Sequence, residues 1–133
     1  MDHFPLVEEQ IAAGREFAER LSAAYPVSVA FWYVPADASD WKLGVASDEI
    51  TSQNDREAYR QIRVILAGGL GDYLDPLQIR LLNSEEPVAA GAIALRDTSP
   101  AKLPVRSRNS LLGNTPVEEV YIYPIAQTAA VPA

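Results

Sequence analysis

The sequence predicts an α+β fold in which a mixed sheet of about four strands packs with three helices. Residues 27–34 and 41–47 are apolar runs rich in β-branched and aromatic residues, joined by a short polar connector, which is typical of a β-hairpin. Three other segments have the apolar spacing or the terminal residues of helices. Two later runs have strand character, so the predicted order of elements is αββαβαβ.

The first helix is predicted over residues 5–25. Its apolar residues recur at spacings of three and four, which places them on one face: Val7, Ile11, Gly14, Ala18, Leu21 and Tyr25. Pro26 ends it, because the residue before a proline disfavours the helical conformation.

The hairpin follows this helix. Only Ser28 is polar in its first run, so we expect both faces of that strand to be covered. The second run alternates, and one of its faces carries the small residues Gly44 and Ala46. We expect a helix to approach closely on that face.

The second helix is predicted over residues 55–66, with Tyr59, Ile62 and Ile65 in its apolar stripe. Gly68-Gly69 ends it, because glycine readily adopts the left-handed conformation of a helix C-cap. Glycines after a helix are a cap rather than a phosphate-binding loop, which would follow a strand.

Residues 77–82 alternate cleanly and predict a third strand, with Leu77, Ile79 and Leu81 facing the core. A third helix follows over residues 85–96, and residues 118–125 form the last strand. Pro124 places that last strand at a sheet edge or at its own end, since proline lacks a ladder donor. The third and fourth strands can each return in parallel through the preceding helix.

The chain of 133 residues is predicted to hold one domain over residues 1–126, with a disordered tail over 127–133. Residues 97–116 contain three prolines and read as a long irregular segment. Loops of that length in a small domain are typically functional, disordered or interaction segments.

The composition excludes several kinds of site. The chain has no cysteine and one histidine, His3, which excludes disulfides, thiolate metal sites and zinc sites built from several histidines. The net charge is −7, so binding to nucleic acid through a broad positive field is disfavoured. We find no secretory signal or membrane-spanning run, expect no cofactor, and expect a bacterial cytoplasmic location.

Trp32 and Trp41 lie on the two paired strands. If they share an exposed face, they form a stacking platform for a ligand or a partner's side chain. The alternative is that they are core residues in cross-strand aromatic pairs.

The segment 102–113 carries Lys102, Arg106 and Arg108 beside hydroxyl and amide donors. Such donors can hold a phosphate or carboxylate group, so the segment is a candidate binder of an anionic small molecule. The alternative is a surface loop whose charges are solvated.

Asp40-Trp41-Lys42 places an acid and a lysine around a strand, as in magnesium-dependent nucleases of the restriction-endonuclease-like fold. That chemistry needs a second carboxylate on a neighbouring strand, and the nearest preceding acid, Asp37, is only a turn away. The alternative is a hairpin turn that uses acids for turn chemistry.

Five short sequence motifs follow one another along the chain: Ala30-Phe31-Trp32, Trp41-Lys42-Leu43 with Ala46-Ser47, Ala58-Tyr59-Arg60, Ile79-Arg80-Leu81 and Tyr121-Ile122-Tyr123-Pro124. Over roughly residues 10–125 this set resembles a family of short bacterial proteins with no established activity. The resemblance implies one compact domain and supplies no catalytic or binding residues.

The sequence therefore favours a non-enzymatic interaction module that binds a second copy of itself or another protein. A homodimer would pair through an exposed edge strand ending at Tyr123-Pro124. A magnesium-dependent phosphodiesterase using Asp40 and Lys42, and an anion binder using Arg106 and Arg108, remain the alternatives.

Overall fold

The computed structural model describes residues 5–38, 40–70, 73–99 and 103–124. The α-helices are α1 (Glu8–Leu21), α2 (Asp55–Ile65) and α3 (Pro87–Arg96), with a π-helical turn η1 (Leu66–Leu70) and a 3₁₀ turn η2 (Pro76–Gln78). The strands are β1 (Val29–Pro35), β2 (Lys42–Ser47), β3 (Ile79–Asn83), β4 (Val105–Leu112) and β5 (Thr115–Ile122). The predicted α+β class is confirmed, with five strands in the sheet rather than four.

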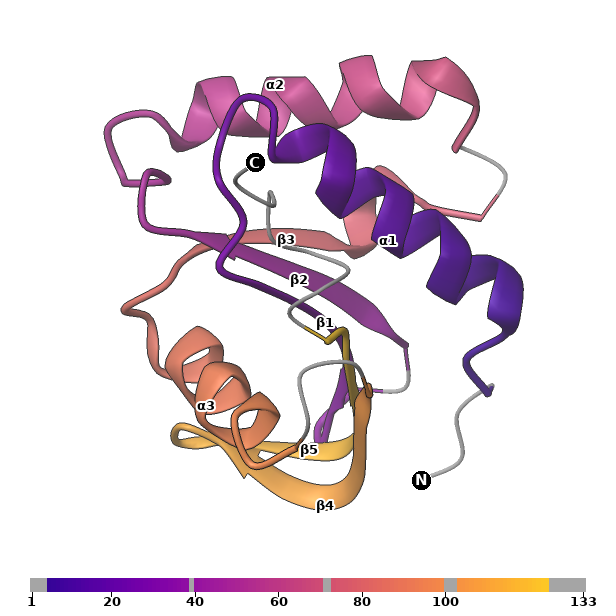
Figure 1. Ribbon diagram of the computed structural model, residues 1–133, viewed down its shortest axis with the longest axis vertical. Coiled ribbons are helices and arrows are strands. Elements are labelled where there is room, and N and C mark those ends of the chain that lie inside the picture. The colour runs from indigo at the N-terminus through magenta and orange to yellow at the C-terminus, as the bar shows by residue number, and fades with distance from the viewer. Residues whose placement is uncertain (1–4, 39, 71–72, 100–102, 125–133) are drawn as a thin grey trace.

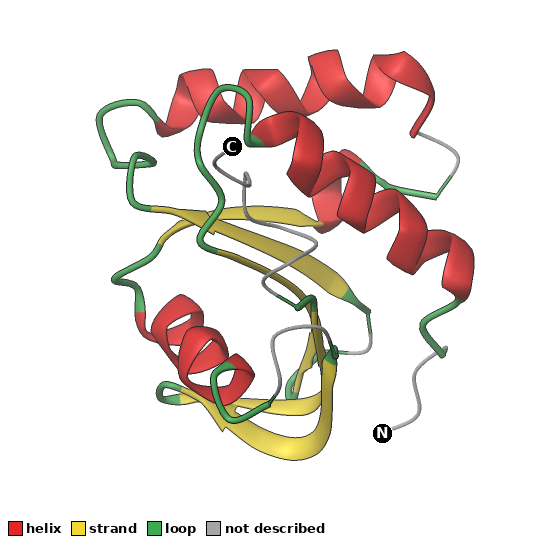
Figure 2. Cartoon of the chain, in the orientation of Figure 1, coloured by secondary structure: helices red, strands yellow, loops and turns green. Residues whose placement is uncertain are grey.

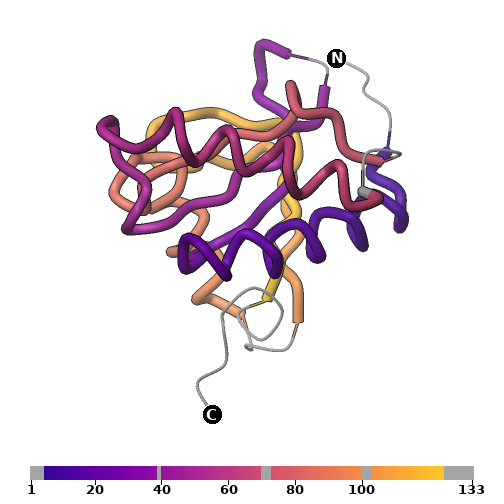
Figure 3. The backbone as a smooth tube through the Cα atoms, turned by 90° about the horizontal axis from the view of Figure 1, so that it is seen from above, coloured from indigo at the N-terminus to yellow at the C-terminus, as the bar shows by residue number. Residues whose placement is uncertain are grey.

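The strands form one mixed sheet in the order β3-β2-β1-β5-β4. The predicted hairpin is present, since β1 and β2 pair antiparallel, and β3 runs parallel to β2 as predicted after a crossover through α2. Helices α1 and α2 lie on one face, and α3 lies on the other (Figures 1 and 2). Seen from above, α1 and α2 lie beside each other (Figure 3).

The core has two layers because both faces of β1 are covered. Beneath α1 and α2 lie Trp32 and Val34 of β1, together with Leu43 and Val45 of β2. On the α3 side, the alternate residues Val29 and Phe31 pack with Ala89 and Ala92 of the helix and with Val120 and Ile122 of β5. The almost wholly apolar sequence of β1 follows from this double coverage.

A hydrogen-bond chain in the first layer joins α1 to the central strand β1 and to the segment that follows β5. The indole N–H of Trp32 donates to Tyr123 Oη at 2.9 Å, and the Tyr123 hydroxyl donates to the carbonyl of Ile11 at 2.5 Å. Burial raises the pKa of Tyr123, so its hydroxyl keeps its proton. Gly14 lies directly above this chain, where a Cβ would be 2.5 Å from Tyr123 Oη.

The small face of β2 is covered by a helix, as predicted, since Ala46 packs in one cluster with Ala89 and Ala92 of α3. At Gly44 the space is taken by the ring of Phe31, its cross-strand partner, which would be 2.7 Å from a Cβ at that position. Helix α3 also approaches the β4–β5 turn closely, where a Cβ on Gly91 would be 2.2 Å from the backbone nitrogen of Gly113. Helix α3 therefore packs on the backbone of the β4–β5 turn.

The irregular segment predicted over residues 97–116 is wrong in its second half, which forms β4. This strand is rich in polar residues, and its pairing with β5 through the two-residue turn Gly113-Asn114 holds it in the sheet. Gly113 has a φ of 64° at the first turn position, as a type II′ turn requires. Sequence periodicity did not reveal β4 because Arg108, Asn109 and Ser110 interrupt the apolar alternation.

Of the two positions that Pro124 indicated for the last strand, the strand end is confirmed and the sheet edge is wrong. Strand β5 lies between β1 and β4, and Pro124 follows its last residue, Ile122, so the proline removes no ladder donor. The predicted parallel return of this strand through the third helix is likewise absent, since β5 is antiparallel to both neighbours. The predicted homodimer therefore has no exposed β5 edge through which its two copies could pair.

The third strand begins later than predicted. Leu77 does not face the core but lies in η2 with 77% of its surface exposed, because the strand begins only at Ile79. Helix α2 ends as predicted at its glycines, with Gly69 in the left-handed region at a φ of 110°. The predicted tail over residues 127–133 lies outside the described residues.

Replacing Gly14 by alanine is expected to destabilise the fold by about 1–3 kcal/mol, because the new methyl group overlaps Tyr123 and Trp32. This loss exceeds the gain of about 1 kcal/mol in helix propensity. The measurement is the free energy of unfolding in urea. Gly68→Ala is the control, since its methyl group meets only the mobile guanidinium of Arg20, and a change of at most about 1 kcal/mol is expected.

Candidate functional site

The tryptophan platform is not formed. Trp32 and Trp41 are both buried in the layer beneath α1 and α2, so neither ring is presented to a ligand. The indole N–H of Trp32 donates to the Tyr123 hydroxyl, so this buried hydrogen-bond donor is satisfied. The core alternative for these aromatic residues is the one that the structure supports.

The structure does bring Arg106 and Arg108 together. Alternate residues of β4 share a face, and both side chains lie near the carboxylate of Glu119 on β5. Arg106 Nε is 3.2 Å from Glu119 Oε2, and Arg108 Nε is 4.0 Å from Oε1. The third predicted member, Lys102, lies outside the described residues.

This cluster is partly neutralised and unevenly exposed. Glu119 is buried, the side chain of Arg106 is 49% exposed, and that of Arg108 is 79% exposed. Arg106 also lies over the ring of Tyr121, 5.8 Å from its centre. Burial raises the pKa of Tyr121, and the nearby charge of Arg106 opposes that shift. Arg108 is therefore the arginine whose charge is more available to a partner.

Asp40 and Lys42 gain no catalytic setting from the fold. Asp40 is exposed in the connection before β2, and Lys42 is half-buried at the start of that strand. Among the described residues, no three histidine, cysteine or acidic side chains gather closely enough to hold a metal ion.

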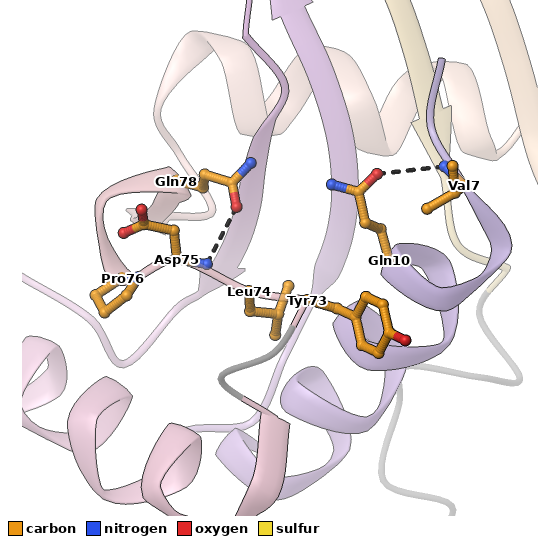
Figure 4. A pocket seen from close by; sticks show the side chains of 7 residues that line it. All are labelled: Val7, Gln10, Tyr73, Leu74, Asp75, Pro76 and Gln78. Atoms are coloured by element: carbon orange, nitrogen blue, oxygen red, sulfur yellow. Dashed lines mark hydrogen bonds between the residues drawn. The ribbon is translucent and has the colours of Figure 1, made fainter. Parts of the chain in front are cut away.

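A hollow of about 620 Å³ lies between the start of α1 and the segment before β3 (Figure 4). Its polar side chains accept hydrogen bonds from nearby backbone N–H groups. Gln10 accepts from the N–H of Val7, Gln78 accepts from the N–H of Asp75, and Asp75 accepts from the N–H of Leu77. These side chains cap the ends of α1 and η2.

Sequence reasoning missed a second hollow, on the outer side of α2. It has a volume of about 290 Å³ and is lined by Arg56, Tyr59, Arg60 and Arg63. Tyr59 was predicted in the buried stripe, but that stripe is Ala58, Ile62 and Ile65, and Tyr59 is exposed. The spacing of the arginines at i, i+4 and i+7 was the signal available in the sequence.

Comparison of the chain with known protein families, with curated proteins and with solved structures found no match in any of the three. The resemblance to a family of short bacterial proteins therefore stays a prediction. Separately, none of the helices in the described ranges combines the length and the apolar character needed to cross a lipid bilayer.

The geometry around Glu119 predicts unequal roles for the two arginines. Arg106→Gln is expected to lower the free energy of unfolding by about 1 kcal/mol, because it removes the closer and less exposed partner of a buried carboxylate. Arg108→Gln is expected to change it by less than about 0.5 kcal/mol. Urea unfolding of both variants measures this, and equal losses would contradict the assignment of Arg106 as the main partner.

Proposed function

We propose that this protein is a non-enzymatic interaction module that binds a protein partner through one face of β4. We call this face the β4 surface and define it by Arg106, Arg108 and Leu111. The observation that carries the proposal is the exposure of Arg108 (79%) and Leu111 (67%) on the outermost strand. Arginine is enriched at protein interfaces and among the residues that contribute most to binding, and the exposed apolar side chain of Leu111 adds area that a partner can bury.

The three side chains share the face of the sheet opposite α3. Asn109, with a φ of 52°, interrupts the regular alternation of β4, so Leu112 lies in the core beneath α3 although Arg106 and Arg108 do not. Its neighbour Leu111 therefore points to the face opposite α3. Arg106 and Arg108 contact Glu119 and Tyr121 on that same face. Helices α1 and α2 lie toward the β1–β2–β3 half of the sheet, away from β4 (Figure 1).

The opposite edge of the sheet is closed to strand pairing. The N–H groups of β3 that point outward are already bonded: Ile79 to the carbonyl of Pro76, Leu81 to Tyr59 Oη at 3.1 Å, and Asn83 to Glu86 Oε2 at 2.7 Å. Covering an edge in this way prevents addition of another strand. Strand β4 is the edge strand that remains open to a protein partner.

The partner's chemistry follows from the charges. Two copies of β4 related by a two-fold axis would bring the same arginines together, and like charges across paired strands are destabilising. A different protein that offers acidic residues to the arginines and an apolar side chain to Leu111 fits the β4 surface better than a second copy of this chain does. We therefore favour a hetero-partner over the homodimer.

The test is affinity capture from a lysate of the organism that encodes the chain, with bound proteins quantified by mass spectrometry. The double variant Arg108→Glu, Leu111→Ser is expected to lose at least about tenfold of the bound partner, because it reverses the charge and removes the apolar contact.

Leu77→Ser is the matched control, since Leu77 is equally exposed at a distant turn. The wild-type chain and this control are expected to retain the same partner. A partner retained by the double variant, or a wild-type chain that captures nothing beyond the level of the double variant, would contradict the proposal. Mass measurement by light scattering on the same samples detects a homodimer directly, which would also count against a hetero-partner.

A further inference from the structure

The hollow on α2 gathers positive charge in an acidic protein. Arg56, Arg60 and Arg63 line it together with Tyr59, although the chain as a whole carries a net charge of −7. All four residues come from one helix and are exposed. We call this set the α2 groove.

Only one of the three arginines is neutralised. Arg60 pairs with Glu57 at 3.1 Å, whereas Arg56 and Arg63 have no acidic side chain within ion-pair distance among the residues that the structure describes. Arg56 also lies in the first turn of α2, where a cation opposes the helix dipole. Arg63 lies in the last turn, where the dipole favours a cation, so helix stability accounts for Arg63 but not for Arg56.

Tyr59 adds a hydrogen-bond donor in a fixed position beside the arginine side chains. Its hydroxyl oxygen accepts the N–H of Leu81 at 3.1 Å, which fixes the phenol at the edge of β3. A tyrosine hydroxyl can accept and donate at once, and within the described residues its own hydrogen has no protein acceptor. The hydroxyl hydrogen is therefore available to a ligand oxygen in the groove.

We propose that the α2 groove binds the phosphate group of a small, soluble phosphate monoester. Guanidinium groups match phosphate oxygens with paired, charge-assisted hydrogen bonds, and Tyr59 supplies a neutral donor. The hollow of about 290 Å³ lies at the lower end of small-molecule pockets and exceeds the size of a phosphate ion alone. This site lies at the opposite edge of the sheet from the β4 surface and does not depend on the proposed interaction with a protein.

The test is a titration of the ¹⁵N-labelled chain by NMR with inorganic phosphate, glycerol 3-phosphate and, for comparison, succinate. Ionic strength is held constant with sodium chloride, because exposed arginines respond to salt alone. Both phosphate ligands are expected to give saturable shifts of the α2 amides at millimolar concentrations, with glycerol 3-phosphate binding more tightly. The amide of Leu81 is a specific reporter, because polarising the Tyr59 hydroxyl alters the hydrogen bond that this amide donates.

The double variant Arg56→Gln, Arg63→Gln is expected to weaken phosphate binding by about tenfold or more, since each lost hydrogen bond is charge-assisted. Both positions are exposed and glutamine favours helix, so circular dichroism should show an unchanged fold. Arg108→Gln is the matched control, an exposed arginine at the other edge of the sheet, and should bind as the wild type does.

Four results would overturn the proposal. The first is the absence of any saturable shift beyond that produced by sodium chloride. The second is unchanged affinity in the double variant, and the third is succinate binding as tightly as glycerol 3-phosphate. Co-sedimentation with vesicles containing phosphatidic acid, without binding of the soluble ligands, would assign the arginines to a membrane surface instead and would also reject it.

Discussion

The contact on which the fold depends is the hydrogen-bond chain from Trp32 through Tyr123 to the carbonyl of Ile11. It joins the central strand, the segment following β5 and the first helix at one buried point. An unpaired indole N–H or phenol at this depth would cost about 1–3 kcal/mol, so the three elements are positioned together or not at all. Gly14 permits the contact because any side chain there would separate α1 from the sheet.

This arrangement determines where the molecule remains open. Helices α1 and α2 cover one face mainly over β1, β2 and β3, and α3 covers the other face over β1, β4 and β5. Two arginine-bearing surfaces lie outside these two layers, one on β4 at one edge of the sheet and one on α2 at the other. Both carry arginines in a chain with a net charge of −7, which is the basis for proposing an anionic partner at each, and they lie at opposite edges of the sheet.

The elements with local signals were predictable from the sequence. The hairpin, the three helices and the parallel return of β3 follow from periodicity, prolines and glycines, which act over short distances along the chain. Strand β4 was not predictable, because its polar residues are held by pairing with β5 rather than by their own propensity. The burial of Trp32 depends on Tyr123, 91 residues away, and the α2 groove depends on Tyr59 turning outward to Leu81. Such contacts belong to the tertiary structure and leave no periodic signal.

The most direct test of this account is the hydrogen exchange rate of the Trp32 indole N–H, measured by NMR in deuterated water. If the Trp32–Tyr123–Ile11 chain joins the three elements, the indole can exchange only when the protein unfolds as a whole. The opening free energy should then equal the free energy of unfolding in urea, within about 1 kcal/mol. Exchange through an opening that costs several kcal/mol less would show that α1 can separate from an intact sheet, and would contradict the central role of this contact.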